Sequence, residues 1–382
     1  ALAALAATSA FAQSSVTLSG QFDGGFASQK TFGQTTGGVI QNASKTTAFK
    51  FNGTEDLGSG LSANFQFEVQ PSFIAGNGNT NNAAVNGASF TAGAYADAAA
   101  VAGTVPQTAQ SGLVGKGQSF VGLKSNTLGT VNFGTINLAT LSAWGTAAQA
   151  FGTNIGSGYK AVGNETTRAE NTVAYVSPAF SGFNASVARS TGQESVYGTS
   201  TTINLRRSEA TEYGLNYENG PLTVKYADLT STSSPKEAAA SANIASKYKT
   251  LAAKYDAGIV RFGALNQKYE ANTAVAGKYT TNLFSIEAPY GAWTFTALTG
   301  KQKVDGVGAA TSATKTIGDN KVASLQAKYD LSKRTYVYVM NEVKTFNSSA
   351  DWAKVVVNGA ALAAAPTDNK VKTTAIGLAH AF

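Results

Sequence analysis

The stretch Ser14–Ala27, SSVTLSGQFDGGFA, alternates apolar and polar side chains with a period of two. One face of an extended chain carries the large apolar residues Val16, Leu18, Phe22 and Phe26. The other face carries Thr, Ser, Gln and Asp at the intervening positions. Because successive side chains of a strand point to opposite faces, this stretch predicts a β-strand between an apolar and a polar environment.

The same alternation recurs to the end of the chain, from TTAFKFNGT at 46–54 to KTTAIGLAHAF at 372–382. It forms about sixteen stretches of roughly eight to twelve residues. Short turns, such as TEDLGSG at 54–60 and DLSK at 330–333, alternate with longer polar segments. We expect these long segments near 29–43, 71–115, 137–167, 190–209, 230–245, 270–277, 301–319 and 346–370. Tight turns at one rim and long loops at the other are typical of an outer-membrane barrel.

The two faces of the predicted strands differ as a bilayer requires. One carries Val, Leu, Phe and Tyr, and the other carries Gly, Ser, Thr, Gln, Asp, Lys and Glu. In a membrane barrel the apolar face contacts lipid and the polar face lines a wet lumen. Closure pairs every strand edge, which hydrocarbon demands because it offers no hydrogen bonds. The sequence therefore predicts an all-β fold, a 16-stranded antiparallel transmembrane β-barrel wide enough for an aqueous channel.

The composition excludes several other classes of protein. Charged residues make up 13% of the chain and hydrophobic residues 43%, and there is no cysteine for a disulfide or thiolate site. The net charge of +7 is spread over scattered Lys and Arg, which does not favour nucleic acid as a partner. We find no zinc spacing and no phosphate-binding glycine loop, and expect neither a metal nor a cofactor. An apolar run of 18 residues is also absent, so no transmembrane helix is expected.

Residues 1–12, ALAALAATSAFA, are uncharged, rich in Ala and Leu, and end in a small-aromatic-small triplet. This pattern predicts part of a secretory signal peptide with its cleavage site. We therefore expect the mature, exported protein to begin at Gln13. Residues 13–382 then form a single barrel domain.

Several motifs along the chain resemble the beta-proteobacterial type of Gram-negative general porin. They are SSVTLSGQFDGG (14–25), GTEDLGSGL (53–61), GKGQSFVGL (115–123), NTVAYVSPAFSGFNAS (171–186), YDLSKRTYVYV (329–339) and IGLAHAF (376–382). The resemblance implies a homotrimer of 16-stranded barrels in an outer membrane of lipid and lipopolysaccharide. It also implies a third outer loop folded into the lumen, here 137–167, and passive diffusion of ions and small hydrophilic solutes.

In such a porin, wall cations facing loop carboxylates narrow the pore and filter solutes by charge. Strand alternation selects the lumen side: Lys50 lies between two apolar phenylalanines, and Arg168 and Glu170 have the parity opposite to Val173. The expected constriction residues are Lys50, Lys116, Gln118, Glu165, Arg168 and Glu170. The alternative for Lys50 and Lys116 is a solvated charge in the lumen or at the rim, away from the narrowest point of the pore.

The chain departs from this family at the pore. The arginines that the resemblance implies near Ala48, near Gly117 and Gln118, and near Thr135 are absent, whereas Arg168 is retained. Glu165 is the only carboxylate of the third loop. We therefore expect only a modest anion preference. The long segment 71–115 is a second departure, and we expect it to act as a latch between subunits.

Three other functions were weighed against a general porin. An enzyme would need a base, and the sole histidine, His380, lies two residues from the C-terminus on the predicted lipid face. A substrate-specific channel would use the same barrel, and the missing arginines leave it as the alternative. A surface adhesin with a plugged lumen is favoured only by the low-complexity segment 71–115.

The chain ends in GLAHAF, an alternating strand that runs to the last residue. We expect it to pair with the first strand, near 17–26, and so to close the barrel. Phe382, His380 and Leu378 are the expected assembly signal, because the resemblance implies that the barrel-assembly machinery reads a terminal aromatic residue.

Overall fold

The computed structural model describes the protein over most of its strands and tight turns. The described residues are 15–31, 34–71, 84–85, 88–89, 117–152, 154–159, 162, 168–197, 204–235, 244–271, 277–307, 320–346, 356–357, 360–361 and 369–382. The predicted signal peptide and most of the 71–115 segment lie outside them. Within the described part of the chain, no helix combines the length and apolarity needed to span a bilayer.

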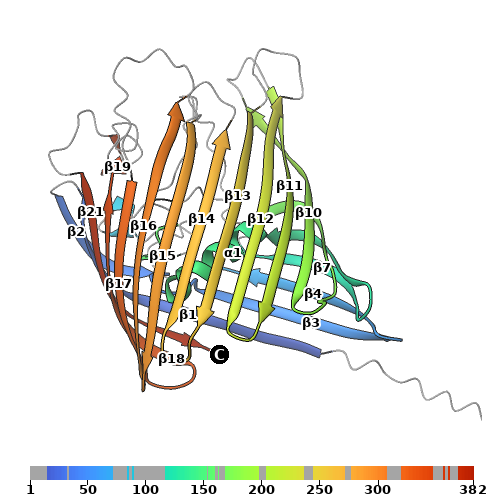
Figure 1. Ribbon diagram of the computed structural model, residues 1–382, viewed down its shortest axis with the longest axis horizontal. Helices are drawn as coiled ribbons and strands as arrows, with labels where there is room; N and C mark the ends of the chain where they lie inside the picture. The colour runs from blue at the N-terminus through green and yellow to red at the C-terminus, as the bar shows by residue number, and fades with distance from the viewer. Residues whose placement is uncertain are drawn as a thin grey trace, which may run out of the picture.

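One large antiparallel sheet contains nearly all of the described chain (Figure 1). Its first half is β1 (Ser15–Thr31), β2 (Gln34–Gln41), β3 (Ala48–Gly58), β4 (Leu61–Val69), β7 (Ser119–Ser125), β8 (Gly129–Asn137), β9 (Arg168–Val176) and β10 (Phe183–Tyr197). Its second half is β11 (Asn204–Asn219), β12 (Leu222–Pro235), β13 (Ile244–Asp256), β14 (Arg261–Ala271), β15 (Gly277–Tyr290), β16 (Trp293–Val307), β17 (Asn320–Asp330), β18 (Thr335–Thr345) and β21 (Lys370–Ala381). Two small hairpins form separate two-stranded sheets, β5 (Ala84–Val85) with β6 (Ala88–Ser89) and β19 (Val356–Val357) with β20 (Ala360–Ala361).

The sheet closes on itself through the two ends of the chain. β21 pairs with β1 from Gln21↔Ala381 to Thr31↔Val371, and its other edge pairs with β18. The opposite edge of β1 pairs with β3 and then with β2, so these two strands share one place in the wall. The predicted closed barrel of 16 strands is thereby confirmed, as is the pairing of the last strand with the first.

The expectation of a long polar segment at 29–43 is wrong. β1 continues to Thr31 and β2 begins at Gln34, so a tight hairpin occupies most of this region. Its Gly- and Thr-rich sequence carries little apolar signal, and pairing with β1 fixes it as a strand. Several other strands also extend beyond their predicted ends; β10, for example, runs to Tyr197.

Exposure alternates along the strands as the sequence predicts. In β17 the side chains of Val322 and Ser324 are buried, whereas Leu325 is 64% exposed on the other face. Phe284 in β15 and Ile376 in β21 belong to the same exposed apolar surface. Large apolar side chains exposed on one face of a closed sheet are what a lipid-facing wall presents, so the buried positions belong to the interior.

Candidate pore constriction

The connection between β8 and β9 contains a helix that the sequence pattern did not predict. α1 (Ala139–Ala148) is followed by a 3-10 turn, η1 (Gln149–Phe151), and α1 packs against β11 to β15 (Figure 1). Trp144 of α1 is fully buried, and its ring packs edge-on against the ring of Tyr159, with 5.1 Å between the two ring centroids. The wall residues beneath it include the buried Leu265 and Leu283. These leucines alternate with the exposed apolar residues, so α1 lies against the interior face of the wall.

A carboxylate of the wall caps the start of α1. The residue before the helix, Leu138, has no side chain that can cap, and the first turn of α1 contains no acid. Glu212 of β11 replaces both, since its carboxylate accepts hydrogen bonds from the backbone amides of Ala139 and Thr140 and from the Thr140 hydroxyl. An anion is favoured at a helix N-terminus because the amides there are unpaired and carry partial positive charge.

Two further buried carboxylates hold the chain beyond α1. Glu287 of β15 accepts a hydrogen bond of 3.1 Å from the amide of Ala150, and Glu342 of β18 accepts one of 3.0 Å from Gly156. Both also bind cations of the wall: Arg261 lies 2.7 Å from Glu287, and Lys344 lies 2.9 Å from Glu342. The segment is thus attached to the barrel wall by its backbone amides.

Neutral side chains complete this attachment. Gln302 donates a hydrogen bond of 2.8 Å to the carbonyl of Val162, and the hydroxyl of Thr281 donates to the same oxygen. Nearer to α1, Ser285 donates to the carbonyl of Ala147, and Gln149 donates to Ser285 at 2.8 Å. Strands β11, β15, β16 and β18 therefore all contribute anchors to the segment.

A second chain excursion lies between β2 and β3. Residues 42–47 face only two residues of β1, because Gln41 pairs with Gly24 while Ala48 pairs with Gln21. The carboxylate of Asp23 is buried beneath them, accepts hydrogen bonds from the amides of Ser44 and Lys45, and receives the Tyr338 hydroxyl at 2.6 Å.

This excursion presents a cation to the interior. The side chain of Lys45 is exposed, within electrostatic range of Glu287 and Lys328. Its neighbour Thr46 donates a hydrogen bond to Asn154, in the segment that follows α1. Lys45 therefore lies beside the anchored segment. The sequence pattern does not select Lys45, because it lies between the predicted long segment 29–43 and the strand predicted from Thr46.

The predicted constriction residue Lys50 forms an ion pair with Glu68, which was not among the predicted constriction residues. Lys50 of β3 lies 3.6 Å from Glu68 of β4, and the two residues are direct register partners. The side chain of Glu68 is 7% exposed and that of Lys50 is 41% exposed, so the cation remains open to solvent. Gln70 donates a hydrogen bond of 2.7 Å to the same carboxylate. Alternation places Glu68 on the interior side, since it has the parity opposite to the exposed Phe65, but only the register pairs it with Lys50.

Gln118 and Arg168 are also brought to this part of the wall. The side-chain oxygen of Gln118 accepts a hydrogen bond of 2.9 Å from the amide of Asn137, and the side chain of Asn137 accepts one of 3.0 Å from Arg168. The guanidinium of Arg168 is also attracted by the carboxylate of Glu68. Lys50, Gln118 and Arg168 thus gather around Glu68.

Arg168 and Glu170 do not follow the predicted alternation. The register between β8 and β9 shifts between Gly134 and Ile136, and Asn171 adopts a left-handed φ of 49°. Because the bulge adds a residue, Ala169 is buried like Thr172 despite the opposite numbering parity. Glu170 is exposed, and its carbonyl accepts a hydrogen bond from Ser190. Arg168 is the first residue of β9, and its attraction to Glu68 does not follow from its numbering parity.

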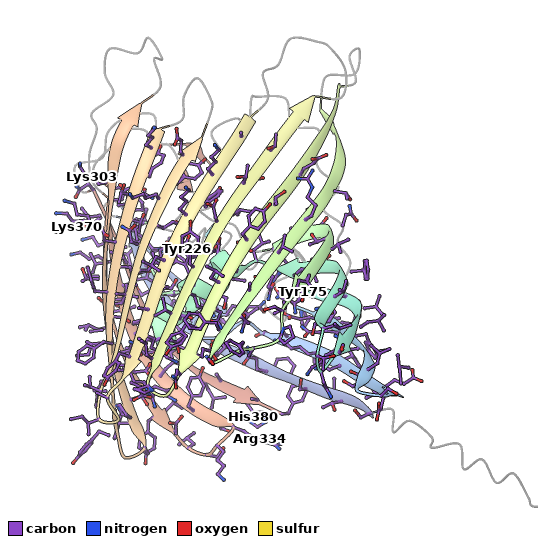
Figure 2. All side chains as sticks on the ribbon, turned by 45° about the vertical axis from the view of Figure 1, so that its right-hand side comes forward. Tyr175, Tyr226, Lys303, Arg334, Lys370 and His380 are labelled. Carbon is purple, nitrogen blue, oxygen red and sulfur yellow. The ribbon has the colours of Figure 1, made fainter. Side chains whose placement is uncertain are left out.

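The remaining predicted positions divide into two groups. Lys116 and Glu165 lie outside the described residues. At the C-terminus, Ile376 and Leu378 are exposed, and His380 accepts or donates a 2.8 Å hydrogen bond with Thr335 at the short-turn end (Figure 2). The ring of Phe382 lies 5.6 Å from that of Phe49, and its backbone exchanges hydrogen bonds with Gly20. No group of residues suited to a metal ion occurs in the described part of the chain.

Comparison with known proteins gives a consistent result. Residues 1–349 match the sequence profile described as Gram-negative porin. An outer membrane porin protein of Bordetella pertussis is 28% identical over 342 residues, covering 79% of this chain and 77% of that protein. The anion-selective porin from Comamonas acidovorans superposes with a TM-score of 0.64 at 20% identity, covering 97% of this chain and all of that one. The trimer form of an in-vitro-folded outer membrane protein of Vibrio cholerae superposes with a TM-score of 0.60 at 12% identity, covering 97% and 99%.

Proposed function

Because this chain belongs to the Gram-negative porin family, an outer-membrane family of water-filled channels, we propose that its pore passes ions and small hydrophilic solutes with a modest preference for anions. The family and its relatives are channels, and a non-enzymatic role is consistent with them. The observation that carries the anion preference is the unequal exposure of charges in the interior. Lys45 and Lys50 are open to solvent, whereas the carboxylate of Glu68 is nearly covered.

We further propose that the 137–167 connection is a loop folded into the lumen, where it narrows the pore. The support is its attachment to Glu212, Glu287 and Glu342 and the burial of Trp144 against the wall. These three carboxylates are 2–7% exposed and accept hydrogen bonds from the segment, so they contribute little to the field in open water. Exposed cations in a confined lumen act on passing ions at close quarters. The preference is modest because the cations are lysines beside carboxylates, not a ring of arginines.

Reversal potentials test the anion preference. We expect purified protein in a planar bilayer, with KCl at different concentrations on the two sides, to give a reversal potential whose sign and size correspond to a modest selectivity for anions. The effect should be larger at low salt, where fixed charges are screened less. Clear cation selectivity would refute the proposal, and saturable block by a single solute would favour a substrate-specific channel instead.

We propose that the protein assembles as a homotrimer, in line with the trimer form of the Vibrio cholerae protein of the same fold. The mass of the detergent-extracted protein, measured by light scattering, should correspond to three chains. The 71–115 segment, most of which lies outside the described residues, is proposed as a latch between subunits. Deleting residues 76–112 should lower the melting temperature of the trimer, and an unchanged value would contradict the latch.

A further inference from the structure

A cavity of about 470 Å³ lies between the start of α1 and the wall of the barrel. Strands β9 to β12 form its floor, and residues 138–142 form its roof. Gly214 and Asn216 of the floor have the parity of the buried Glu212, whereas Tyr213 and Leu215 are exposed on the outer face, so the cavity belongs to the interior. Its volume falls within the range of roughly 300–1,000 Å³ that is typical of small-molecule sites.

Small side chains beneath the first turn of α1 keep the cavity open. Ser186 and Gly214 are register partners on β10 and β11, and both line the floor. A Cβ atom on Gly214 would lie 3.1 Å from the Cβ of Ala139, closer than such atoms normally pack. Glycine at this position therefore lets the helix start lie above the wall without filling the space between them.

A row of polar side chains crosses the floor. Asn184, Asn216 and Lys225 are direct register partners on β10, β11 and β12, and all three line the cavity. The ammonium of Lys225 lies 2.8 Å from the hydroxyl of Ser142 in the roof and 3.9 Å from the carboxylate of Glu218. Glu218 is 59% exposed, so it offsets the charge of Lys225 only weakly. The row therefore offers one cation beside two amides.

The amide of Asn216 has a free acceptor. Its Oδ1 is buried, and no donor among the described residues lies within hydrogen-bonding distance of it. A buried acceptor without a donor is destabilising, and native structures seldom keep one without a reason. Because this oxygen has no bond to lose, the amide can turn toward the cavity at little cost. A hydroxyl group of a ligand would then donate to it.

We infer that this cavity is a binding niche for a sugar acid, a polyhydroxylated monocarboxylate. Lys225 binds the carboxylate, Asn184 and Asn216 bind hydroxyls, and the apolar side chains of the roof cover the carbon chain. Glu212 in the floor and Glu218 beside Lys225 disfavour a second negative charge on the ligand. The inference rests on the proposed channel function, which admits the solute to the lumen, and it names one solute class within that function.

The test removes the charge and the free acceptor separately. Detergent-solubilised wild type, K225M and N216L are titrated with gluconate, and binding is measured by ligand-observed NMR. Wild type should bind gluconate saturably, K225M about tenfold or more weakly, and N216L about threefold to tenfold more weakly. Asn216→Leu removes an unpaired buried acceptor, so its unfolding temperature should not fall, which separates lost binding from lost folding.

The matched control is Lys328→Met on β17. Lys328 is another interior lysine, 24% exposed against 22% for Lys225, and it lies outside the cavity lining. K328M should bind gluconate as wild type does. A loss in K328M equal to that in K225M would point to the general charge of the lumen and overturn the niche, as would wild-type affinity in either K225M or N216L.

Two further ligands test the assigned class. Sorbitol has the hydroxyls without the carboxylate, and hexanoate has the carboxylate without the hydroxyls, so both should bind wild type more weakly than gluconate. Binding of either one as tight as that of gluconate would overturn the assignment to a sugar acid. The titration in detergent needs no ion flow. Absence of conductance in a planar bilayer would therefore refute the proposed channel while leaving the binding result intact.

Discussion

Replacing Glu212 by alanine should release the first turn of α1 from the barrel wall. The carboxylate accepts hydrogen bonds from two backbone amides, Ala139 and Thr140, and from the Thr140 hydroxyl. A hydrogen bond to a charged group contributes about 1.5–3 kcal/mol. Because lumen water can replace part of what is lost, we count the two amides at the lower value, which gives about 3 kcal/mol. The population with a detached first turn should then rise about 100-fold.

The absence of cysteine from the chain provides a direct assay. Ala143 lies one turn after Thr140 and is fully buried, so a thiol introduced by Ala143→Cys is shielded while α1 is attached. When detachment and reattachment are fast, the rate of thiol modification follows the detached population. E212A/A143C should therefore react much faster than A143C alone, by up to about 100-fold. Single-channel recordings of E212A should show additional conductance substates.

The matched control is Glu209→Ala in the same strand. Glu209 pairs with Arg189 on the outer face of the wall, so its loss should change neither labelling nor conductance. Glu212→Gln retains one acceptor oxygen without the charge and should give an intermediate rate. If E212A/A143C reacted no faster than A143C, the wall carboxylate would not be what holds α1, and the reasoning would be refuted.

Three further outcomes are expected. Lys45→Gln should lower the anion preference seen in reversal potentials, whereas Lys333→Gln at the short-turn rim should not. An equal loss of anion preference in both variants would exclude a local role of the 42–47 excursion. Trp144→Ala removes a fully buried ring, at a cost of about 3–5 kcal/mol, and should raise the open-channel conductance. An unchanged conductance would mean that α1 does not limit the pore. Deleting Phe382 removes the ring and backbone contacts that seal β21 to β1, so the yield of folded protein should fall while the conductance of surviving channels is kept. Normal yield would count against the assembly role, and the exposed Phe180→Ala serves as the control.

The barrel was predictable because its signal is local and repeated. Each strand such as β17 alternates on its own, and a lipid-facing wall makes the apolar half of that alternation unusually clear. β2 escaped prediction because its sequence, QTTGGVIQ, is nearly devoid of large apolar residues, and only its pairing with β1 makes it a strand. α1 escaped for a similar reason: it contains neither a capping side chain nor an acidic first turn, and its cap comes from Glu212 in another strand.

The candidate constriction was only partly predictable, because its contacts join distant segments. Alternation placed Lys50 on the face opposite to the exposed Phe51. It did not identify an ion-pair partner for Lys50, and Glu68 was identified only from the register of β3 with β4. Alternation failed outright at Arg168, because a bulge shifts the parity of β9 at Asn171. No periodic pattern can locate such a bulge. Lys45 was hidden in an irregular excursion whose form depends on the buried carboxylate of Asp23.

The buried carboxylates of the wall link the pore to the fold. Asp23, Glu212, Glu287 and Glu342 are all buried in the wall, and each accepts a backbone amide from a segment that enters the interior. A carboxylate used in this way orders the segment, but it is largely withdrawn from the water through which ions pass. Lysines, with long flexible stems, reach that water more easily. Because these acids anchor backbone segments, the exposed Lys45 and Lys50 support the proposed anion preference even though arginines are absent near Ala48 and Thr135.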